Sequence, residues 1–565
     1  MLLGIDVGGT HTDAVIIGRG GVVATAKIKT DHNDLIASLH RVLKRILQPV
    51  QASSIRRINL STTLTTNAIV EDKLERVGVL AVSGPGLAEP FFNRDLGDHF
   101  YLLPGSIDHR GAQREALHKN ATAAALADCR QQDLRVYAVA AKFSTRNPDM
   151  ELELAGRLAG QSDFTTIGHR ISGNLNFPRR LATAYYNSAV WRGYNSFADA
   201  MAAGLSNFNL DAPLNILKAD GGTIDFANSR RNPVQTILSG PAASVMGIIA
   251  LNPITEDAII LDIGGTTTDI AIFADGAPLL EKDGVTFGGR ATLVRAITSR
   301  PIGIGGDSAI TTTSDGAISV GPWRRGPALA FDGPQATLID ACNFKNLCRL
   351  GRPEKSIAGI NRLAAALAIS GAEVATRAIR FALDKIYRAT ERLLAEINQK
   401  PVYTVAEVLH GKTIQPKQLH IMGGPAAILA PLLGETFALP TWVPENYAVA
   451  NAIGAALTRP TMEINLFADT SKKEMLIPNL GLREAVGSSY TLTEARRDGV
   501  ARLSLYLKQN GHPELEEQEV SVTEAETFNM IDDYTAGSSR SIRVSCQIRP
   551  GLDNTWLKEV RNHAD

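Results

Sequence analysis

Two segments far apart in the chain carry the same order of carboxylates, glycines and hydroxyls. Residues 5–23 read IDVGGTHTDAVIIGRGGVV and residues 261–279 read LDIGGTTTDIAIFADGAPL. Each window is an apolar run ending in Asp, a Gly-Gly-Thr turn, a second apolar run and a later glycine before a third. This spacing is typical of a β-meander. Because order and residue type both match, the repeat predicts two similar lobes.

A Gly-Gly-Thr turn suits phosphate binding. Its backbone N–H groups point into one concavity, and glycine lets a ligand approach without meeting a Cβ. The threonine hydroxyls add hydrogen-bond donors that carry no charge. The predicted phosphate-binding residues are Gly8, Gly9, Thr10, Thr12, Gly264, Gly265, Thr266 and Thr267.

Asp6 and Asp262 each end the strand that precedes a turn. Two carboxylates beside the phosphates of a nucleotide would repel them unless a hard cation such as Mg²⁺ lay between. The pair therefore predicts a magnesium–nucleotide site, with the metal held through waters, and both residues are catalytic and metal-binding candidates. The alternative is a tight hairpin in which Asp only forms the turn. Two copies at strand ends favour the functional interpretation.

The elements around these turns follow from hydrophobic periodicity. Residues 35–47 show the spacing of an amphipathic helix, with Asp31 or Asn33 as its cap. Buried strands are expected at 77–82 and 134–141. A helical stretch has an apolar stripe that we assign to the core, formed by Ile379, Leu383, Ile386, Thr390, Leu393 and Ile397.

The predicted fold class is α/β in three parts. We expect an N-terminal lobe over residues 1–190 and a second lobe with insertions over 191–460. Shorter runs and polar clusters in 461–565 predict a small C-terminal α+β domain.

Three further segments fit a nucleotide site. A strand at 419–422 leads into Gly423-Gly424-Pro425, a turn that can pack on a purine ring; a plain strand-to-helix turn is the alternative. Residues 448–457 form a small-residue helix suited to close packing near a hinge. The hydroxyl-rich stretch 61–68 follows another strand. In spacing and order, these segments and the two turns resemble the motifs of the actin–hexokinase–heat-shock ATPase superfamily. The resemblance implies two RNase H-like lobes around a cleft that holds ATP and Mg²⁺.

Over residues 1–460 the chain also resembles the A-subunit (ATP-binding) group of the hydantoinase/5-oxoprolinase family. The specific feature is TILSGPAASVMG at 236–247 followed by LDIGGTTTDIAI at 261–272. The resemblance implies an enzyme that couples ATP hydrolysis to hydrolysis or carboxylation of a cyclic amide or related carbonyl compound. It also implies a B-type partner subunit, with a homo-oligomer as the alternative.

The same resemblance places Thr62, Thr66, Asn67 and Glu71 near the γ-phosphate. It makes Glu71 the base or the group that positions water; a surface glutamate is the equal alternative.

The chain departs from the family pattern at residues 298–308. Family members commonly carry Asp-x-His-Thr before their second glycine-rich loop, whereas this chain reads Thr-Ser-Arg-Pro, and Asp307 replaces a loop glycine. Arg300 suits recognition of an anionic group. An Arg300–Asp307 ion pair that closes the loop is the alternative. Cyclic-amide hydrolysis depends on what these residues do.

Composition narrows the choice of partners. Lys plus Arg and Asp plus Glu both number 58, so no overall field favours nucleic acid or an anionic membrane. The start lacks the pattern of a secretory signal, and we find no run of ~18 apolar residues. The four cysteines form no C-x-x-C pair. We expect a cytoplasmic protein with reduced thiols, no nucleic-acid or membrane partner, and a small-molecule substrate.

Two rival functions remain. A small-molecule kinase would use a carboxylate base in the cleft, with Glu71 or Asp307 as candidates. A nucleotide-switched binding protein, such as a reactivating chaperone, would use ATP to close the lobes and would have no small substrate.

Overall fold

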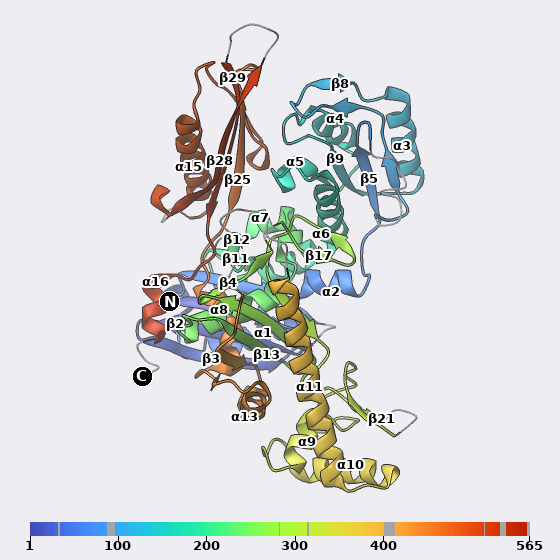
Figure 1. The fold of residues 1–565 in the computed structure, drawn as a ribbon, viewed down its shortest axis with the longest axis vertical. Helices are drawn as coiled ribbons and strands as arrows, with labels where there is room; N and C mark the ends of the chain where they lie inside the picture. The colour runs from blue at the N-terminus through green and yellow to red at the C-terminus, as the bar shows by residue number, and fades with distance from the viewer. Residues whose placement is uncertain are drawn as a thin grey trace.

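The computed structural model describes residues 1–31, 34–86, 96–281, 283–312, 316–399, 413–512, 515–531 and 538–561. Two sheets face each other across a central layer of helices, and two smaller domains lie together at one end (Figure 1). The opposite end is a helical projection formed by α9 (Leu338–Phe344), α10 (Pro353–Leu367) and α11 (Gly371–Asn398).

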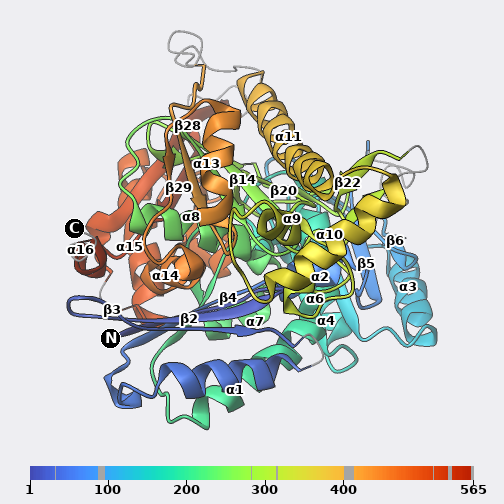
Figure 2. The same cartoon turned by 90° about the horizontal axis from the view of Figure 1, so that it is seen from below.

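The first lobe is built on a mixed sheet. Its strand order is β12 (Thr223–Asp225), β11 (Leu214–Leu217), β4 (Arg57–Thr62), β1 (Leu2–Val7), β2 (His11–Gly18) and β3 (Gly21–Lys29). The first three strands along the chain form the predicted antiparallel meander, and β4 joins β1 in parallel. Helix α1 (Leu35–Ile46) covers one face of this sheet. Helices α8 (Ser239–Leu251) and α14 (Ala450–Leu457) lie on the opposite face (Figure 2).

The second lobe repeats the meander. Strand β14 (Thr268–Ala274) pairs antiparallel with β13 (Ala258–Ile263), and β23 (Gln418–Met422) pairs with β13 in parallel. The sheet is extended by β15 (Ala277–Pro278), β20 (Ser299–Ile302) and β24 (Thr441–Trp442). Helices α11 and α13 (Ala426–Phe437) pack on its outer side. The predicted stripe on α11 lies in this core, which confirms its assignment.

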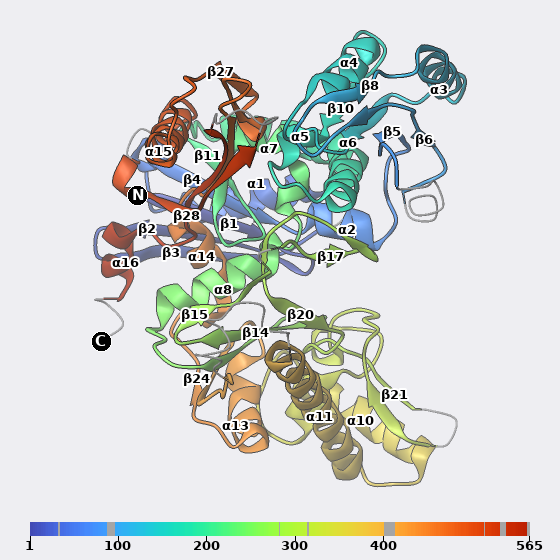
Figure 3. The same ribbon diagram turned by 45° about the horizontal axis from the view of Figure 1, so that its top comes forward.

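Two helices lie between the sheets. Helix α8 (Ser239–Leu251) contacts α14 (Ala450–Leu457), and both also contact strands of the first sheet. Figure 3 shows α8 between β1, β2 and β4 on one side and β14 and β20 on the other. Both helices are rich in small residues, so their backbones come close together.

An insertion in the first lobe forms a separate parallel sheet. Its strands are β10 (Phe164–Ile167), β9 (Val136–Ala141), β5 (Val77–Val82) and β6 (Phe100–Leu102), flanked by α3 (Lys119–Gln131) and α4 (Asp149–Leu158). The C-terminal domain is a sheet of β25 (Glu463–Asp469), β26 (Glu474–Ile477), β27 (Leu482–Ala485), β28 (Val520–Ile531) and β29 (Ser538–Ile548), covered by α15 (Leu492–Gln509). Helix α16 (Asn554–Arg561) returns to pack on α8 and β3.

The α/β fold class and the α+β character of the C-terminal domain are as predicted, but two details are wrong. The predicted boundary at 190/191 falls inside α6 (Phe177–Ser206), and β11 and β12 complete the first sheet. Helix α6 runs without interruption from the inserted domain to the strands β11 and β12 of the first sheet. The hydrophobic periodicity of the sequence therefore shows no boundary near residue 190. The cap of α1 is Asp34, whose side chain accepts from Ala37 N, instead of Asp31; Asn33 lies outside the described residues.

Within the described ranges, no single helix has both the length and the apolar composition to cross a membrane, although the bent pair α10–α11 meets both criteria together. All four cysteines are free thiols, and Cys129, Cys342 and Cys546 are buried.

Candidate nucleotide site

The two repeated turns face one cavity of about 860 Å³ between the lobes. In each lobe the antiparallel register sets two aspartates opposite each other: Asp6 pairs with Asp13, and Asp262 pairs with Asp269. Four carboxylates therefore reach the cavity from two equivalent strand pairs. The repeat seen in the sequence is thus a repeat in space.

Most of the predicted site residues line this cavity. They are Asp6, Gly8, Gly9, Thr10, Asn67, Asp262, Gly264, Gly265, Thr266, Thr267, Gly423, Gly424 and Pro425. Gly423 shows why this turn needs glycine: its φ is +91°, and a Cβ would lie 2.3 Å from the carbonyl oxygen of Ile263. The turn is therefore packed directly against the end of β13, beside Asp262.

Four predicted residues do not line the cavity. One of them is Thr66, whose hydroxyl oxygen accepts from the backbone N–H of Leu238 at 2.9 Å. Thr12 is buried behind the first turn, and its hydroxyl shares a hydrogen bond with Thr30. Thr62 is buried, and its backbone carbonyl accepts from the Ser239 hydroxyl. Glu71 caps the C-terminal end of α2 (Leu64–Val70), is half exposed and forms an ion pair with Lys73 at 2.6 Å. The three threonines support the walls, and Glu71 occupies a surface position.

Several residues that the sequence analysis did not select also face the cavity. The Asn451 amide, at the start of α14, lies 3.4 Å from one oxygen of Asp6 and 3.4 Å from one oxygen of Asp262. The Ser244 hydroxyl donates to Asp262 Oδ2 at 2.5 Å. Lys27 donates to Asp13 at 2.7 Å. One amide side chain thus connects the strand-end carboxylates of both lobes.

The cavity perturbs its carboxylates strongly. Burial, reinforced by Asp13, raises the pKa of Asp6 to about 7. Burial, reinforced by Asp262, raises the pKa of Asp269 to about 7. Burial raises the pKa of Asp13 to about 6 against the opposing effect of Lys27, and it also raises the pKa of Asp262. Negative charge in this cavity is therefore poorly compensated by the chain itself.

The donor set suits a hard divalent cation. Oδ1 of Asp6 and Oδ1 of Asp13 are buried and have no hydrogen-bond partner in the described part of the chain. Carboxylate oxygens with unused lone pairs can coordinate Mg²⁺ or accept hydrogen bonds from its bound waters. No group of three or more His, Cys, Asp or Glu side chains among the described residues is arranged to hold a metal by itself. The residues present fit Mg²⁺ that also binds water and phosphate.

The departure at residues 298–308 has a structural explanation. Arg300 on β20 binds Glu396 of α11 through two hydrogen bonds, at 2.8 and 2.5 Å. Asp307 lines the cavity and accepts from Arg324 at 2.9 Å. The alternative of an Arg300–Asp307 ion pair is therefore wrong, because each residue has another partner. The backbone N–H of Asp307 donates to the carbonyl of Gly265 at 2.7 Å, so this loop supports the second phosphate turn.

Two facing turns of this kind, on two related sheets, define a two-lobed protein with the actin-like ATPase fold. Family models for hydantoinase/oxoprolinase and for the hydantoinase/oxoprolinase N-terminal region match residues 180–464 and 2–159. The chain belongs to the hydantoinase/oxoprolinase family.

Named relatives in sequence include three enzymes. The alpha subunit of caprolactamase from Pseudomonas jessenii is 26% identical over 57% of this chain and 50% of that protein. The 5-oxoprolinase of Saccharomyces cerevisiae is 22% identical over 60% and 31%. The beta subunit of acetone carboxylase from Xanthobacter autotrophicus is 24% identical over 61% and 53%. The chain thus matches about a third to a half of the length of these curated relatives.

Two solved structures share the fold. A nucleotide-free acetone carboxylase aligns with a TM-score of 0.72 at 15% identity, covering 98% of this chain and 87% of that one. The ATP-dependent caprolactamase from Pseudomonas jessenii aligns with a TM-score of 0.65 at 18% identity, covering 96% and 87%. The architecture extends over nearly the whole chain.

Proposed function

We propose that this chain is an ATP-hydrolysing subunit that couples ATP hydrolysis to hydrolysis or carboxylation of a cyclic amide or related carbonyl compound. The observation that carries the proposal is the meeting of two Asp–Gly-Gly-Thr turns in one cavity, with Asn451 between their carboxylates. The family and its ATP-dependent members support the choice of nucleotide. Several of these relatives are named as subunits, which supports a B-type partner.

In this proposal the two turns hold the phosphates of ATP, and the turn at Gly423–Pro425 packs against the base. Asp6 and Asp262 would hold Mg²⁺ through its waters, and the cation would neutralise phosphate charge. Lys27 and Lys29 line the same cavity and add positive charge. Transfer of the γ-phosphoryl group of ATP to the carbonyl oxygen would release ADP and make that oxygen a better leaving group, because it would depart as phosphate. The chain itself contributes positioning and charge neutralisation, as in other phosphoryl transfers.

A proton acceptor is available without Glu71. Asp269 has a pKa of about 7, raised by burial and by Asp262, and Asp13 has a pKa of about 6. A carboxylate with a pKa near the working pH is an effective general base. We therefore propose that Asp269 accepts the proton from the attacking nucleophile, since Asp13 is already paired with Lys27. We assign Glu71 no role at the cavity. The kinase alternative also loses Glu71 as its catalytic base. Its other candidate base, Asp307, is paired with Arg324.

The cytoplasmic location also belongs to this proposal. All four cysteines are free, as expected in a reducing compartment.

Phosphate release tests the function. We expect magnesium-dependent ATP hydrolysis that rises several-fold with at least one of caprolactam, 5-oxoproline, hydantoin, or acetone with bicarbonate. EDTA should abolish the activity, since the cation is part of the site. Mass spectrometry of the same reactions should detect ring-opened or carboxylated product. ATP turnover that none of these compounds changes, with no product formed, would instead support a nucleotide-switched binding protein.

A further inference from the structure

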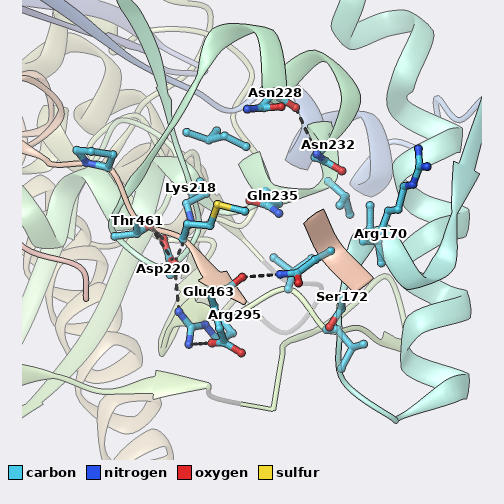
Figure 4. Close-up of a pocket in the computed structure, with 18 of the residues that line it drawn as sticks. Arg170, Ser172, Lys218, Asp220, Asn228, Asn232, Gln235, Arg295, Thr461 and Glu463 are labelled. Atoms are coloured by element: carbon cyan, nitrogen blue, oxygen red, sulfur yellow. Dashed lines mark hydrogen bonds and ion pairs between the residues drawn. The ribbon is translucent and has the colours of Figure 1, made fainter. Parts of the chain in front are cut away.

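A second cavity of about 170 Å³ lies where the first lobe meets the C-terminal domain, apart from the nucleotide site (Figure 4). One wall is the edge of the first sheet, from Lys218 after β11 to Thr223 in β12. Another is the loop after α5 (Gly168–Ile171), and the C-terminal domain closes the third side. The volume is close to the ~150 Å³ of a cavity that holds benzene. A compound of a few heavy atoms would fit.

The three carboxylates that line this cavity all have partners within the protein. Asp220 accepts from Lys218 at 3.1 Å, from the N–H of Gly222 at 3.0 Å and from the Thr461 hydroxyl. Both oxygens of Asp225 accept from Asn228. Glu463 is ion-paired with Arg295. Because each of these carboxylates already has a donor of the protein beside it, the cavity does not favour a cationic ligand.

Two of the positively charged side chains of this cavity, in contrast, have hydrogen-bond donors that remain available for a ligand. Lys218 is only 8% exposed, yet its sole hydrogen-bond acceptor in the described part of the chain is Asp220. Because an ammonium carries three donors, two remain without a partner. Across the cavity, Arg170 makes no ion pair with the described residues. Burying a cation with unused donors is costly, so an anionic oxygen bound at Lys218 would offset that cost.

Two neutral side chains that line the same cavity also have a polar atom without a partner in the described part of the chain. The Thr223 hydroxyl is buried without a hydrogen-bond partner among the described residues. The amide oxygen Oδ1 of Asn479 is likewise buried and accepts no hydrogen bond from them. The Gln235 amide points into the same space (Figure 4). The rest of the lining includes apolar side chains that can cover a short carbon skeleton: Val234, Leu293, Val294, Met462 and Leu507.

We propose that this cavity binds a small organic carboxylate that also carries an amide or hydroxyl group, with its carboxylate on Lys218. This site goes beyond the proposed nucleotide chemistry. The two cavities are linked by one continuous segment of the chain. Asn232 and Gln235 line the second cavity, and Gly240, Pro241 and Ser244, a few residues later, line the nucleotide cavity. A compound bound here contacts the segment that leads directly into α8 and its phosphate-facing end.

Calorimetric titration with N-acetylglycine, which carries one carboxylate and one amide, tests this site. We expect saturable binding by the full chain and at least about tenfold weaker binding by N-acetylglycinamide, which lacks the charge. Lys218→Met should weaken N-acetylglycine binding by about tenfold or more. Lys355→Met is the matched control: Lys355 pairs with Asp332 at an exposed site on α10 and should have no effect.

Lys218→Met also removes the partner of Asp220 and can impair folding, so Arg170→Ala at an exposed position is the second variant. It should weaken binding several-fold while the chain still binds a non-hydrolysable ATP analogue. The proposal fails if a chain that binds that analogue does not bind N-acetylglycine. It also fails if the acid and the amide bind equally, or if neither Arg170→Ala nor a folded Lys218→Met changes the affinity.

Discussion

Asp6→Asn is expected to weaken binding of the magnesium–ATP complex by about 10–100-fold, while making the ligand-free protein more stable. The loss follows from removing a carboxylate that faces the cation. The gain in stability follows from removing the buried negative charge of Asp6, whose Oδ1 has no hydrogen-bond partner in the described ranges. We expect this gain to be about 1–3 kcal/mol above pH 7.

The pH dependence follows from the raised pKa of Asp6, about 7 in the folded protein, which is caused first by burial and then by Asp13. A raised pKa means that the folded state holds this proton more tightly than the unfolded chain does. The contribution of this proton to folding stability is complete below about pH 4. That contribution is lost as the pH rises through about 7, where folded Asp6 ionises. The advantage of Asp6→Asn should therefore be small at pH 4 and reach its full size above pH 7. Thermal unfolding of ligand-free protein at several pH values measures it.

Asp108→Asn is the matched control with the opposite sign. Burial opposes ionisation of Asp108, but hydrogen bonds from the N–H of Ala112, from Arg114 and from the N–H of Arg110 hold its pKa below the usual range. Replacing this carboxylate should lower stability at pH 7 and leave nucleotide binding unchanged. The account of the cavity is wrong if Asp6→Asn destabilises the ligand-free protein at pH 8 as much as Asp108→Asn does.

Gly454→Ala is expected to cost about 3 kcal/mol in the free energy of unfolding, or to prevent folding. Gly454 of α14 packs against α8, where an added Cβ would lie 2.3 Å from the carbonyl oxygen of Ala243 and 2.4 Å from the nitrogen of Gly247. Both obstacles are backbone atoms of a buried helix, so neither can rotate away. The two central helices would have to separate, and Asn451 would move with α14.

Gly156→Ala makes the same chemical change on a helix with free space. Gly156 is exposed in α4, and an added Cβ there meets no atom within 4 Å. This substitution should be neutral or should stabilise by about 0.5–1 kcal/mol. Chemical denaturation of the two variants separates steric overlap from helix propensity. Equal effects at both positions would contradict the close contact between α8 and α14.

The sequence predicted the parts of the site that depend on backbone shape. Gly-Gly-Thr turns at strand ends have a local signature, and two copies of it predicted two lobes. Asp13 and Asp269 belong to the same repeat and could have been selected, because register places each opposite Asp6 or Asp262. Asn451 and Ser244 gave no such signal, since only the packing of α14 and α8 brings them to the carboxylates.

The errors have equally local causes. Glu71 follows a hydroxyl-rich helix whose earlier turn lines the cavity through Asn67, but the helix ends before it and leaves the side chain at the surface. Arg300 and Asp307 are close in sequence, yet β20 turns Arg300 toward α11 while Asp307 faces the cavity. Proximity along the chain did not predict which groups pair, because partners came from α11 and from the loop that carries Arg324.

Calorimetric titration of the unmodified chain with a non-hydrolysable ATP analogue, with Mg²⁺ and with EDTA, tests the central claim most directly. A nucleotide site between the two turns predicts one binding event per chain that requires Mg²⁺, and Asp262→Asn should reduce it strongly. No Mg²⁺-dependent binding by the unmodified chain, or equal binding by Asp262→Asn, would contradict the account.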